Sequence, residues 1–543
     1  MTRKPALIWM IALCLSATVA LAPAQEAKQE TRPDHKSTEA NPASSPAPIQ
    51  ADSITEGSVT VGGQAIAYKA VAGTLTVGAT NAEDALLGLD GKLLADSGIQ
   101  PTEKPEDARP TARIFYAAYF KKGAPSESRP ITFLYNGGPG SSTMWLHMGS
   151  FGPKRVVTTD TLHEAAAPYK IVPNPYSLLD VSDLVFIDAP GTGFSRIFGK
   201  GKEEAFWGLD PDAHAFERFI RRFLTKYDRW NSPKYLFGES YGTPRSAVLS
   251  ADLHGVDLNG IVLLSAILSF DNSADDPKVN PGVDQAYALA LPTYAASAWY
   301  HKLIPNPPAT LEPLLAEVEK FALGEYMSAL LQGSELPEAQ RQAIAAKLHD
   351  YTGLPLAYIL KSDLRIEGGA FSKTLQDDAG ITTGRLDTRY EGPDLDRLSE
   401  SAQYDPQSIA ISSAYTTAIN QYLRDDLNYG ANWTYKVNTY GDPGFKWPFR
   451  TTESGPNVMP DLARTMIANP KTRVLLAGGY YDLATPYFEG KFEMHHLPIP
   501  AKLQSNISYR YYQAGHMIYV NEAILKQFHD DVAAFIKGTE AAK

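Results

Sequence analysis

A serine held between two glycines is the strongest chemical signal in this sequence. Ser240 lies in a Gly-Glu-Ser-Tyr-Gly run, with Gly238 and Gly242 at the two-residue offsets on either side. Glycines at these positions permit the tight, strained turn that lifts a serine hydroxyl out of a sheet. The apolar run 235–237 precedes the serine, and a helical pattern follows from Thr243. The sequence therefore predicts a nucleophilic serine at a strand-to-helix turn, with the helix N-terminus directed at its hydroxyl.

A serine nucleophile needs a general base and an acid that orients the base. In enzymes built around such a turn, the acid and then the base follow the serine along the chain. His516 follows the strand-like run 508–513 and lies in a loop before the last helix, which makes it the candidate base. Asp482 follows an apolar strand pattern and is the candidate acid. Asp482 can also be interpreted as the cap of the turn 483–486, and both roles can hold together.

Three other histidines near the C-terminus are less suited to catalysis. His529 falls within the final helical pattern and is predicted to be a surface residue. His495 and His496 are adjacent, so they cannot both face one site on a helix. We interpret these two as solvated or packing residues.

Two loops that contain glycine follow other predicted strands. The run Asn-Gly-Gly-Pro-Gly-Ser-Ser begins at Asn136, directly after the predicted strand 131–135. Glycines let backbone N–H groups approach a ligand oxygen, so this loop is predicted to form an oxyanion hole rather than a plain tight turn. The second loop, within residues 186–195, also follows a strand and is by itself interpreted as structural.

Most of the chain alternates short apolar runs with helical patterns. A β-hairpin is predicted over 58–77 and an amphipathic helix over 212–227. Further strands are predicted over 113–120, 131–135, 183–187, 235–237, 261–265 and 473–477. Alternation of this kind predicts an α/β fold with a mainly parallel central sheet and helices on both faces.

The alternation stops between residues 272 and 420. That segment contains long helical patterns at 311–331 and 337–351. We interpret it as an inserted, largely helical cap over the active face, with a separate domain as the alternative. The sheet core is then predicted to comprise residues 56–271 and 421–543.

The N-terminal residues have the pattern of an export signal. Arg3 and Lys4 precede an apolar run over 6–22, and Ala22 and Ala24 provide the small residues of a cleavage site. We expect residues 1–24 to be a signal peptide cleaved after Ala24, which predicts a periplasmic or secreted protein that makes no membrane contact after cleavage. The alternative is an uncleaved membrane anchor, for which the run is short.

Cysteine content and composition limit the chemistry of the mature chain. The only cysteine, Cys14, lies in the predicted signal peptide, so neither disulfides nor a thiol nucleophile are expected. Residues 25–55 are rich in Ala, Pro, Ser, Glu and Lys without an apolar period, and a disordered linker is predicted there. The net charge of −11 argues against nucleic acid as a partner. The sequence has no H-E-x-x-H motif, cysteine cluster or P-loop, so no metal or other cofactor is expected.

Taken together, these motifs resemble those of the serine carboxypeptidase family, of the yeast and plant vacuolar type. The family shows Asn-Gly-Gly-Pro-Gly, Asp-x-Pro-x-Gly-x-Gly-Phe-Ser, Gly-Glu-Ser-Tyr, a late Asp and a final Gly-His-Met. All five occur here in this order, over residues 110–537, with Asn-Pro-Tyr-Ser at Asn174 upstream of the second motif. The resemblance implies an α/β-hydrolase fold.

The resemblance also implies roles for individual residues. Ser240, Asp482 and His516 would form the catalytic triad. The oxyanion would be held by two backbone amides, those of Gly138 and Tyr241. Two side chains would bind the free C-terminal carboxylate of a peptide, those of Asn136 and Glu239. A carboxyl group can hydrogen-bond a carboxylate only if one of the two is protonated, which explains why such enzymes favour acidic conditions.

The chain departs from the family pattern at three places. Ser150 stands where the family usually has a second glutamate, so we expect weaker carboxylate recognition or a less acidic pH optimum. Ser141 replaces the family's cysteine, as expected of a disulfide-free, bacterial-type member. The run Gly-Gly-Tyr-Tyr-Asp that ends at Asp482 replaces the usual Gly-Asp-x-Asp and is one residue longer.

The function implied is release of C-terminal amino acids from peptides through a covalent acyl-enzyme. One alternative is an exopeptidase like proline iminopeptidase, which shares the Gly-Gly-Pro-Gly loop but usually has Gly-x-Ser-Trp-Gly around its serine. An esterase or acyltransferase could use the same triad. The last alternative is a non-catalytic binding protein on a hydrolase scaffold.

Overall fold

A computed structural model describes residues 50–98, 104–275, 277–449 and 456–541. The predicted signal peptide with Cys14, and most of the predicted linker, lie outside these ranges. The first strand, β1 (Ser53–Val61), begins inside the segment 25–55 that was predicted to be disordered. It pairs with β2 (Gln64–Gly78) through a Gly-Gly turn, which confirms the predicted hairpin.

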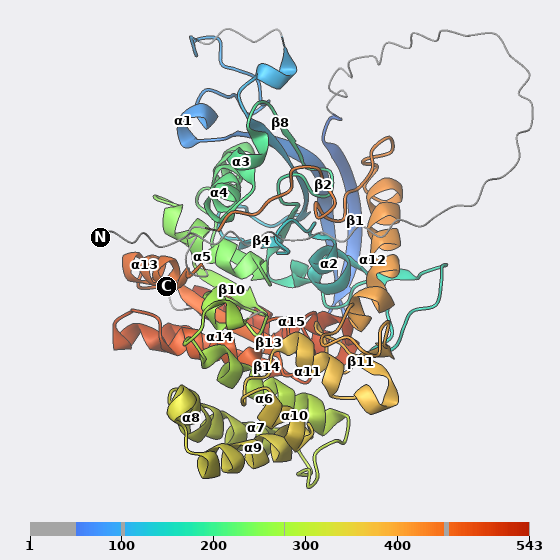
Figure 1. The fold of residues 1–543 in the computed structure, drawn as a ribbon. Helices are drawn as coiled ribbons and strands as arrows, with labels where there is room; N and C mark the ends of the chain where they lie inside the picture. The colour runs from blue at the N-terminus through green and yellow to red at the C-terminus, as the bar shows by residue number, and fades with distance from the viewer. Residues whose placement is uncertain (1–49, 99–103, 276, 450–455, 542–543) are drawn as a thin grey trace, which may run out of the picture. The chain divides into compact units, whose positions relative to one another are not determined.

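A mixed sheet of ten strands forms the centre of the fold (Figure 1). Its order is β1-β2-β3-β7-β4-β9-β10-β13-β14, with β8 paired to β3. The strands from β7 to β14 are parallel, whereas β1, β2 and β3 form an antiparallel side. The other sheet strands are β3 (Thr111–Lys121), β4 (Ile131–Tyr135), β7 (Asp183–Ile187), β8 (Arg196–Phe198), β9 (Lys234–Glu239), β10 (Gly260–Leu264), β13 (Arg473–Gly479) and β14 (Ile507–Tyr512).

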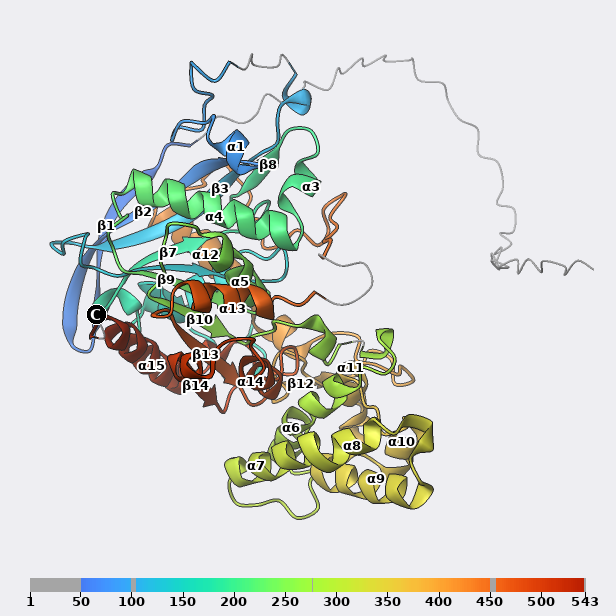
Figure 2. The ribbon, with the colours of Figure 1, turned by 90° about the vertical axis from the view of Figure 1, so that its left-hand side faces the viewer.

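Side chains that alternate along the strands build one apolar core on each face of the sheet. In β3, Phe115 and Ala117 belong to the core that includes α12 (Pro406–Asp425) and α15 (Glu522–Ala541). Ile114 and Tyr116 belong to the opposite core. The helices of that second core are α4 (Leu209–Lys226), α5 (Gly242–Asp252), α13 (Met459–Ala468) and α14 (Tyr487–His495). This arrangement is an α/β-hydrolase fold, as predicted (Figure 2).

The chain between β10 and α12 is mostly helical and builds a third apolar core, to which Tyr481, Leu483, Tyr487 and Phe488 also contribute. Its helices are α6 (Gln285–Tyr300), α7 (Leu311–Phe321), α8 (Met327–Leu330), α9 (Glu338–Thr352), α10 (Leu356–Lys361) and α11 (Gly368–Thr374). A short hairpin follows, β11 (Ile381–Thr383) and β12 (Glu391–Pro393). Both ribbon views show α6–α10 as a group beside β14, and Glu319 of α7 bonds Tyr487 and Lys491 of α14 (Figures 1 and 2). No helix within the described ranges is long and apolar enough to cross a membrane.

Smaller elements complete the fold. They are α1 (Asn81–Asp84), α2 (Met144–Leu146), α3 (Lys202–Phe206), β5 (Lys154–Val156) and β6 (Ile171–Pro173). A π-helical turn, His147–Phe151, continues α2. Another, Ala322–Tyr326, joins α7 to α8, so the helical pattern predicted over 311–331 is one interrupted helical run.

Helix α14 carries two glutamates that are fully buried. Glu493 accepts hydrogen bonds from the backbone N–H groups of Leu268 and Ser269, both at 2.8 Å. Neither oxygen of Glu489 has a hydrogen-bond partner among the residues that the structure describes. Burial, reinforced by the charge of Glu493, raises the pKa of Glu489 well above its ordinary value. Glu489 therefore keeps its proton in the folded state at pH values where the unfolded chain has lost it.

Replacing Glu489 with glutamine should make the protein less sensitive to alkaline pH. In the wild type the folded state binds more protons than the unfolded state above the ordinary glutamate pKa, so the free energy of unfolding falls as pH rises. The free energy of unfolding falls by about 1.4 kcal/mol for each pH unit over which Glu489 is ionised in the unfolded state but not in the folded state. Urea denaturation should give a higher midpoint for Glu489→Gln than for wild type at about pH 8, and similar midpoints at about pH 4. The exposed Glu400, changed to Gln, is the control; identical pH dependence in all three proteins would contradict the interpretation.

Candidate active site

The parallel strands bring the predicted site residues to one edge of the sheet. Asn136 follows β4, Ser240 follows β9, Asp482 follows β13 and His516 follows β14. The carboxyl ends of parallel strands form such sites in open α/β sheets. Six of the seven predicted site residues line one cavity of about 780 Å³: Asn136, Gly138, Glu239, Ser240, Tyr241 and His516. The seventh, Asp482, is fully buried and contacts His516.

The turn at Ser240 has the strained geometry predicted for it. Ser240 adopts a φ of 58°, in the left-handed region that non-glycine residues rarely occupy. A Cβ atom at Gly238 would lie 2.1 Å from the carbonyl oxygen of Gly242, so only glycine fits there. The N–H of Ser240 donates to the Leu264 carbonyl of the neighbouring strand β10 at 3.0 Å. The Ser240 carbonyl in turn accepts from the N–H of Thr243, 2.8 Å away in the first turn of α5.

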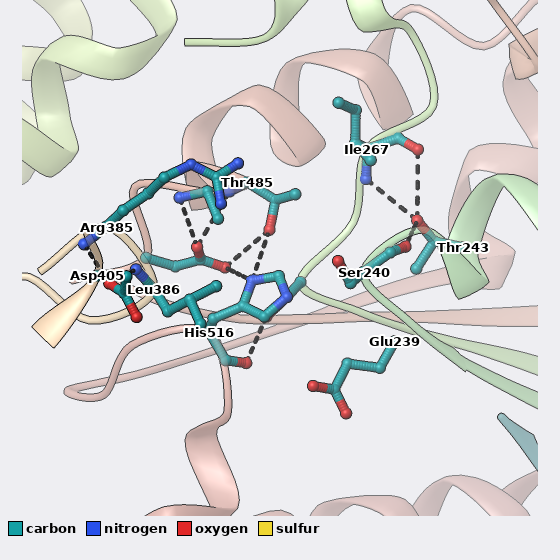
Figure 3. Close-up of polar contacts among 12 residues, drawn as sticks. Glu239, Ser240, Thr243, Ile267, Arg385, Leu386, Asp405, Thr485 and His516 are labelled. Atoms are coloured by element: carbon teal, nitrogen blue, oxygen red, sulfur yellow. Dashed lines mark hydrogen bonds and ion pairs between the residues drawn. The ribbon is translucent and has the colours of Figure 1, made fainter. Parts of the chain in front are cut away.

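His516 and Asp482 form a closed hydrogen-bonded pair. Nδ1 of His516 donates to Oδ2 of Asp482 at 2.8 Å, and the same oxygen accepts from the hydroxyl of Thr485 at 2.7 Å. Oδ1 accepts from the backbone N–H groups of Ala484 and Thr485, at 2.9 and 3.0 Å. Asp482 therefore caps its own turn and also orients His516. Figure 3 shows the imidazole between Thr485 and Ser240.

The charge of Asp482 controls the protonation of His516. Burial lowers the pKa of His516, but the adjacent Asp482 carboxylate and, more weakly, Glu239 act against it, so the pKa is raised above its ordinary value. A bond from Nδ1–H to Asp482 leaves Nε2 as the nitrogen that can accept a proton. Nε2, on the side of the imidazole that faces Ser240, is therefore free to act as a base.

The glycine loop after β4 packs directly against the turn at Ser240. A Cβ atom at Gly137 would lie 2.3 Å from the backbone nitrogen of Tyr241, and Gly138 adopts a φ of 113°. Arg245 of α5 holds this loop in place by donating a hydrogen bond to the carbonyl of Asn136 at 2.7 Å. Arg245 is itself buried and paired with Asp212 at 2.6 Å. The two segments that carry Gly138 and Tyr241 are thus held in contact.

Glu239 lies beside Ser240 and is bonded by neutral hydrogen-bond donors. Asn136 donates through Nδ2 to Oε2 of Glu239 at 2.9 Å, and its Oδ1 accepts from the N–H of Leu146. The hydroxyl of Tyr519 lies 3.0 and 2.9 Å from the two oxygens of Glu239. Burial raises the pKa of Glu239 to about 7, although His516, Tyr519 and Asn136 each lower it. The carboxyl group therefore changes charge near neutral pH.

Sequence reasoning missed several residues of the site and placed one wrongly. The missed residues are Arg245, Thr485, Tyr519 and Arg385, of which Arg385 lines the cavity and pairs with Asp275. The prediction that His529 is a surface residue is wrong, because only 8% of it is exposed. Its ring lies between Asp180, at 3.3 Å, and Asp530, at 3.0 Å, since this face of α15 packs against the segment before β7. His495 and His496, interpreted as solvated or packing residues, are both exposed.

Comparison with known proteins finds one family that part of this chain resembles. Residues 105–255 match the family model described as serine carboxypeptidase. Within this segment the chain is similar to serine carboxypeptidases. The matched segment contains the glycine loop after β4 and the turn at Ser240, whereas Asp482 and His516 lie beyond it.

Individual proteins match only part of this chain, and this chain spans about a quarter of their length. A carboxypeptidase Y homolog of Arthroderma benhamiae is 35% identical over 125 residues, which cover 23% of this chain and 22% of that protein. Serine carboxypeptidase-like 36 of Arabidopsis thaliana is 27% identical over 135 residues, which cover 24% of this chain and 26% of that protein. Among solved structures, the proline iminopeptidase of Mycobacterium smegmatis aligns with 90% of this chain and 99% of its own, at 12% identity and a TM-score of 0.33.

Proposed function

We propose that this protein is an exported serine carboxypeptidase that releases C-terminal amino acids from peptides. The proposal rests on one observation: two functional groups of residues lie at the same cavity. One is Ser240 on its strained turn, beside the pair of His516 and Asp482. The other is the carboxyl of Glu239 bonded to Asn136, on the residue that precedes the nucleophile. The first group of residues is suited to acyl transfer, and the second is suited to binding a terminal carboxylate.

The proposed reaction proceeds through a covalent acyl-enzyme. His516 takes the proton of the Ser240 hydroxyl as the oxygen attacks the carbonyl carbon of the last peptide bond. The backbone amides of Gly138 and Tyr241 hold the oxyanion of the tetrahedral intermediate. His516 then gives the proton to the nitrogen of the departing amino acid. Water, activated by the same imidazole, releases the shortened peptide.

Asp482 holds the imidazole in the tautomer that this sequence of steps requires. Its carboxylate also stabilises the imidazolium formed during the reaction. Because Asp482 accepts four hydrogen bonds, its position does not depend on His516 alone.

The proposal includes the layout of the chain. Residues 1–24 act as an export signal, and 25–52 as a linker up to β1. Residues 53–271 and 406–543 form the catalytic core, since β1 begins at Ser53 and α12 packs in the sheet core, and 272–405 form the cap. Support for the cap comes from Ser273, Asp275 and Arg385, which line the cavity from that segment.

Paired peptides test the activity directly. The full mature protein is incubated with N-blocked peptides that differ only in a free or amidated C-terminus, and release of the last residue is followed by mass spectrometry. We expect the free acid to be cleaved at acidic to neutral pH with at least about a tenfold higher kcat/KM, the size of effect that one hydrogen bond to a charged group gives. Equal cleavage of both peptides would contradict a carboxypeptidase. Hydrolysis of a simple ester with neither peptide cleaved would instead indicate an esterase.

A further inference from the structure

The residue at the position where the family usually has a second glutamate does not form a hydrogen bond with Glu239. Ser150 occupies that position and is fully buried. Its hydroxyl donates to the carbonyl of Leu146, one turn earlier in the same helical segment, at 2.6 Å. Its hydroxyl proton is therefore used within that segment and is not available to Glu239.

A tyrosine from another part of the chain occupies the space beside Glu239. Tyr519 comes three residues after His516, and its hydroxyl lies within 3.0 Å of both oxygens of Glu239. Its ring packs on the backbone next to Ser150, since a Cβ atom at Gly149 would lie 2.7 Å from the ring. Only 2% of Tyr519 is exposed. Packing thus holds the phenol in one place, with its O–H group directed at the carboxyl.

We propose that Tyr519 is a specificity-determining residue that takes the place of the second acidic group, as a permanent hydrogen-bond donor to Glu239. This inference rests on the proposed function, in which Glu239 receives the C-terminal carboxylate of the substrate. The role differs from that of an acid. Two carboxyl groups must share a proton in order to bond, whereas a phenol always carries one.

The hydrogen-bond pattern decides where the proton of neutral Glu239 lies. Oε2 accepts from Asn136, whereas Tyr519 is the one donor to Oε1 among the residues that the structure describes. The acidic proton therefore belongs on Oε1, with the Tyr519 hydroxyl donating to Oε2. Neutral Glu239 can then donate this proton to a substrate carboxylate. Once Glu239 ionises, it repels the same group.

Several charged or titratable groups face Glu239 from other elements. His516 lowers its pKa and Asp482 raises it. Tyr415 of α12 is also close enough to feel its charge, but its own hydroxyl bonds Thr158. The pKa of Tyr519 lies well above its ordinary value because of burial and the neighbouring Glu239, so Tyr519 stays a neutral donor. Removing the Tyr519 hydroxyl takes away a stabiliser of the ionised carboxylate and should raise the pKa of Glu239.

The test measures binding in a full chain that cannot turn over. In Ser240→Ala, calorimetry gives the affinities of an N-benzoyl dipeptide with a free C-terminus and of its carboxamide from pH 5 to 9. A charged His516 would also favour the free acid, so the same ratio is measured in Ser240→Ala/His516→Gln, where the imidazole charge is absent and the ratio reports the charge of Glu239. We expect the preference for the free acid to fall with a midpoint near pH 7. Adding Tyr519→Phe should move the midpoint upward by about one pH unit, as expected for losing one hydrogen bond to a charged group.

Controls separate a role in specificity from a role in packing. Tyr415→Phe removes another buried hydroxyl near Gly149 and should leave the midpoint unchanged. A free-acid preference whose midpoint does not move in Tyr519→Phe would overturn the inference and leave the proposed function standing. If no preference for the free acid appears at any pH, both fail.

A spectroscopic measurement keeps the inference testable if Tyr519→Phe does not fold. Infrared difference spectra between Ser240→Ala and Ser240→Ala/Glu239→Gln isolate the carboxyl band of Glu239, and its titration gives the pKa with Tyr519 intact. A pKa near neutral supports the inference. A pKa of about 8 to 9 or higher, as found for buried glutamates without such donors, would overturn it.

Discussion

Ser240→Ala should abolish peptide hydrolysis, with kcat lower by about four to six orders of magnitude. The loss is this large because the substitution removes the atom that forms the acyl-enzyme, and no other side chain can replace it at the strained turn. What remains is the contribution of the oxyanion amides and of substrate binding, which act without the nucleophile. A double variant with His516→Ala should be scarcely slower than either single variant, because the two residues act as one unit.

The measurement is steady-state release of the C-terminal residue from a free-acid peptide, with folding checked by circular dichroism and thermal melting. Ser250→Ala is a matched control: it removes a buried hydroxyl from the same helix, α5, where Ser250 bonds Ala247 and Thr465. The control should retain the activity of the wild type. A kcat of Ser240→Ala within about tenfold of wild type would place the nucleophile elsewhere, since loss of a true nucleophile costs far more.

The parts of the fold that could be predicted depend on contacts that are short along the chain. Alternating apolar residues and a Gly-Gly pair were enough to predict the β1–β2 hairpin, because the turn sets its own register, with Val61 opposite Gln64. The turn at Ser240 was predictable because its steric requirements fall on Gly238 and Gly242, which contact each other. The turn after Asp482 is also local, since its donors are two and three residues away.

The parts that could not be predicted depend on residues far apart in the sequence. Tyr519 and Glu239 are 280 positions apart, and no periodic pattern connects them. Arg245 bonds the carbonyl of Asn136 across 109 positions, so its role becomes visible only when α5 lies beside the loop after β4. His529 looked like a surface residue because its acidic partner Asp180 belongs to a segment that lies 349 positions earlier. Such contacts depend on strand order, which local patterns do not specify.

Asp482→Asn should lower kcat by about four orders of magnitude and should also destabilise the protein. The reason is that both oxygens of Asp482 accept two hydrogen bonds each. In asparagine one of these oxygens becomes an NH₂ group, which must face donors in either orientation of the amide. If it faces His516, the imidazole must accept at Nδ1 and carry its proton on Nε2, where it cannot act as a base toward Ser240. If it faces Ala484 and Thr485, two backbone N–H groups lose their acceptor and the turn is weakened.

The kinetic and thermal consequences of this substitution can be separated experimentally. Turnover of a free-acid peptide reports the tautomer of His516, whereas the melting temperature reports the turn that Asp482 caps. Thr485→Ser is the matched control, because it retains the hydroxyl that bonds Asp482 and should stay within about tenfold of wild-type kcat, the change expected when a neutral hydrogen bond is at most weakened. A kcat of Asp482→Asn close to that of wild type would show that Asp482 only caps its turn, and that another group orients His516. A loss of kcat with an unchanged melting temperature would indicate that the asparagine adopts the first orientation, in which the backbone donors stay paired and only the base is disabled.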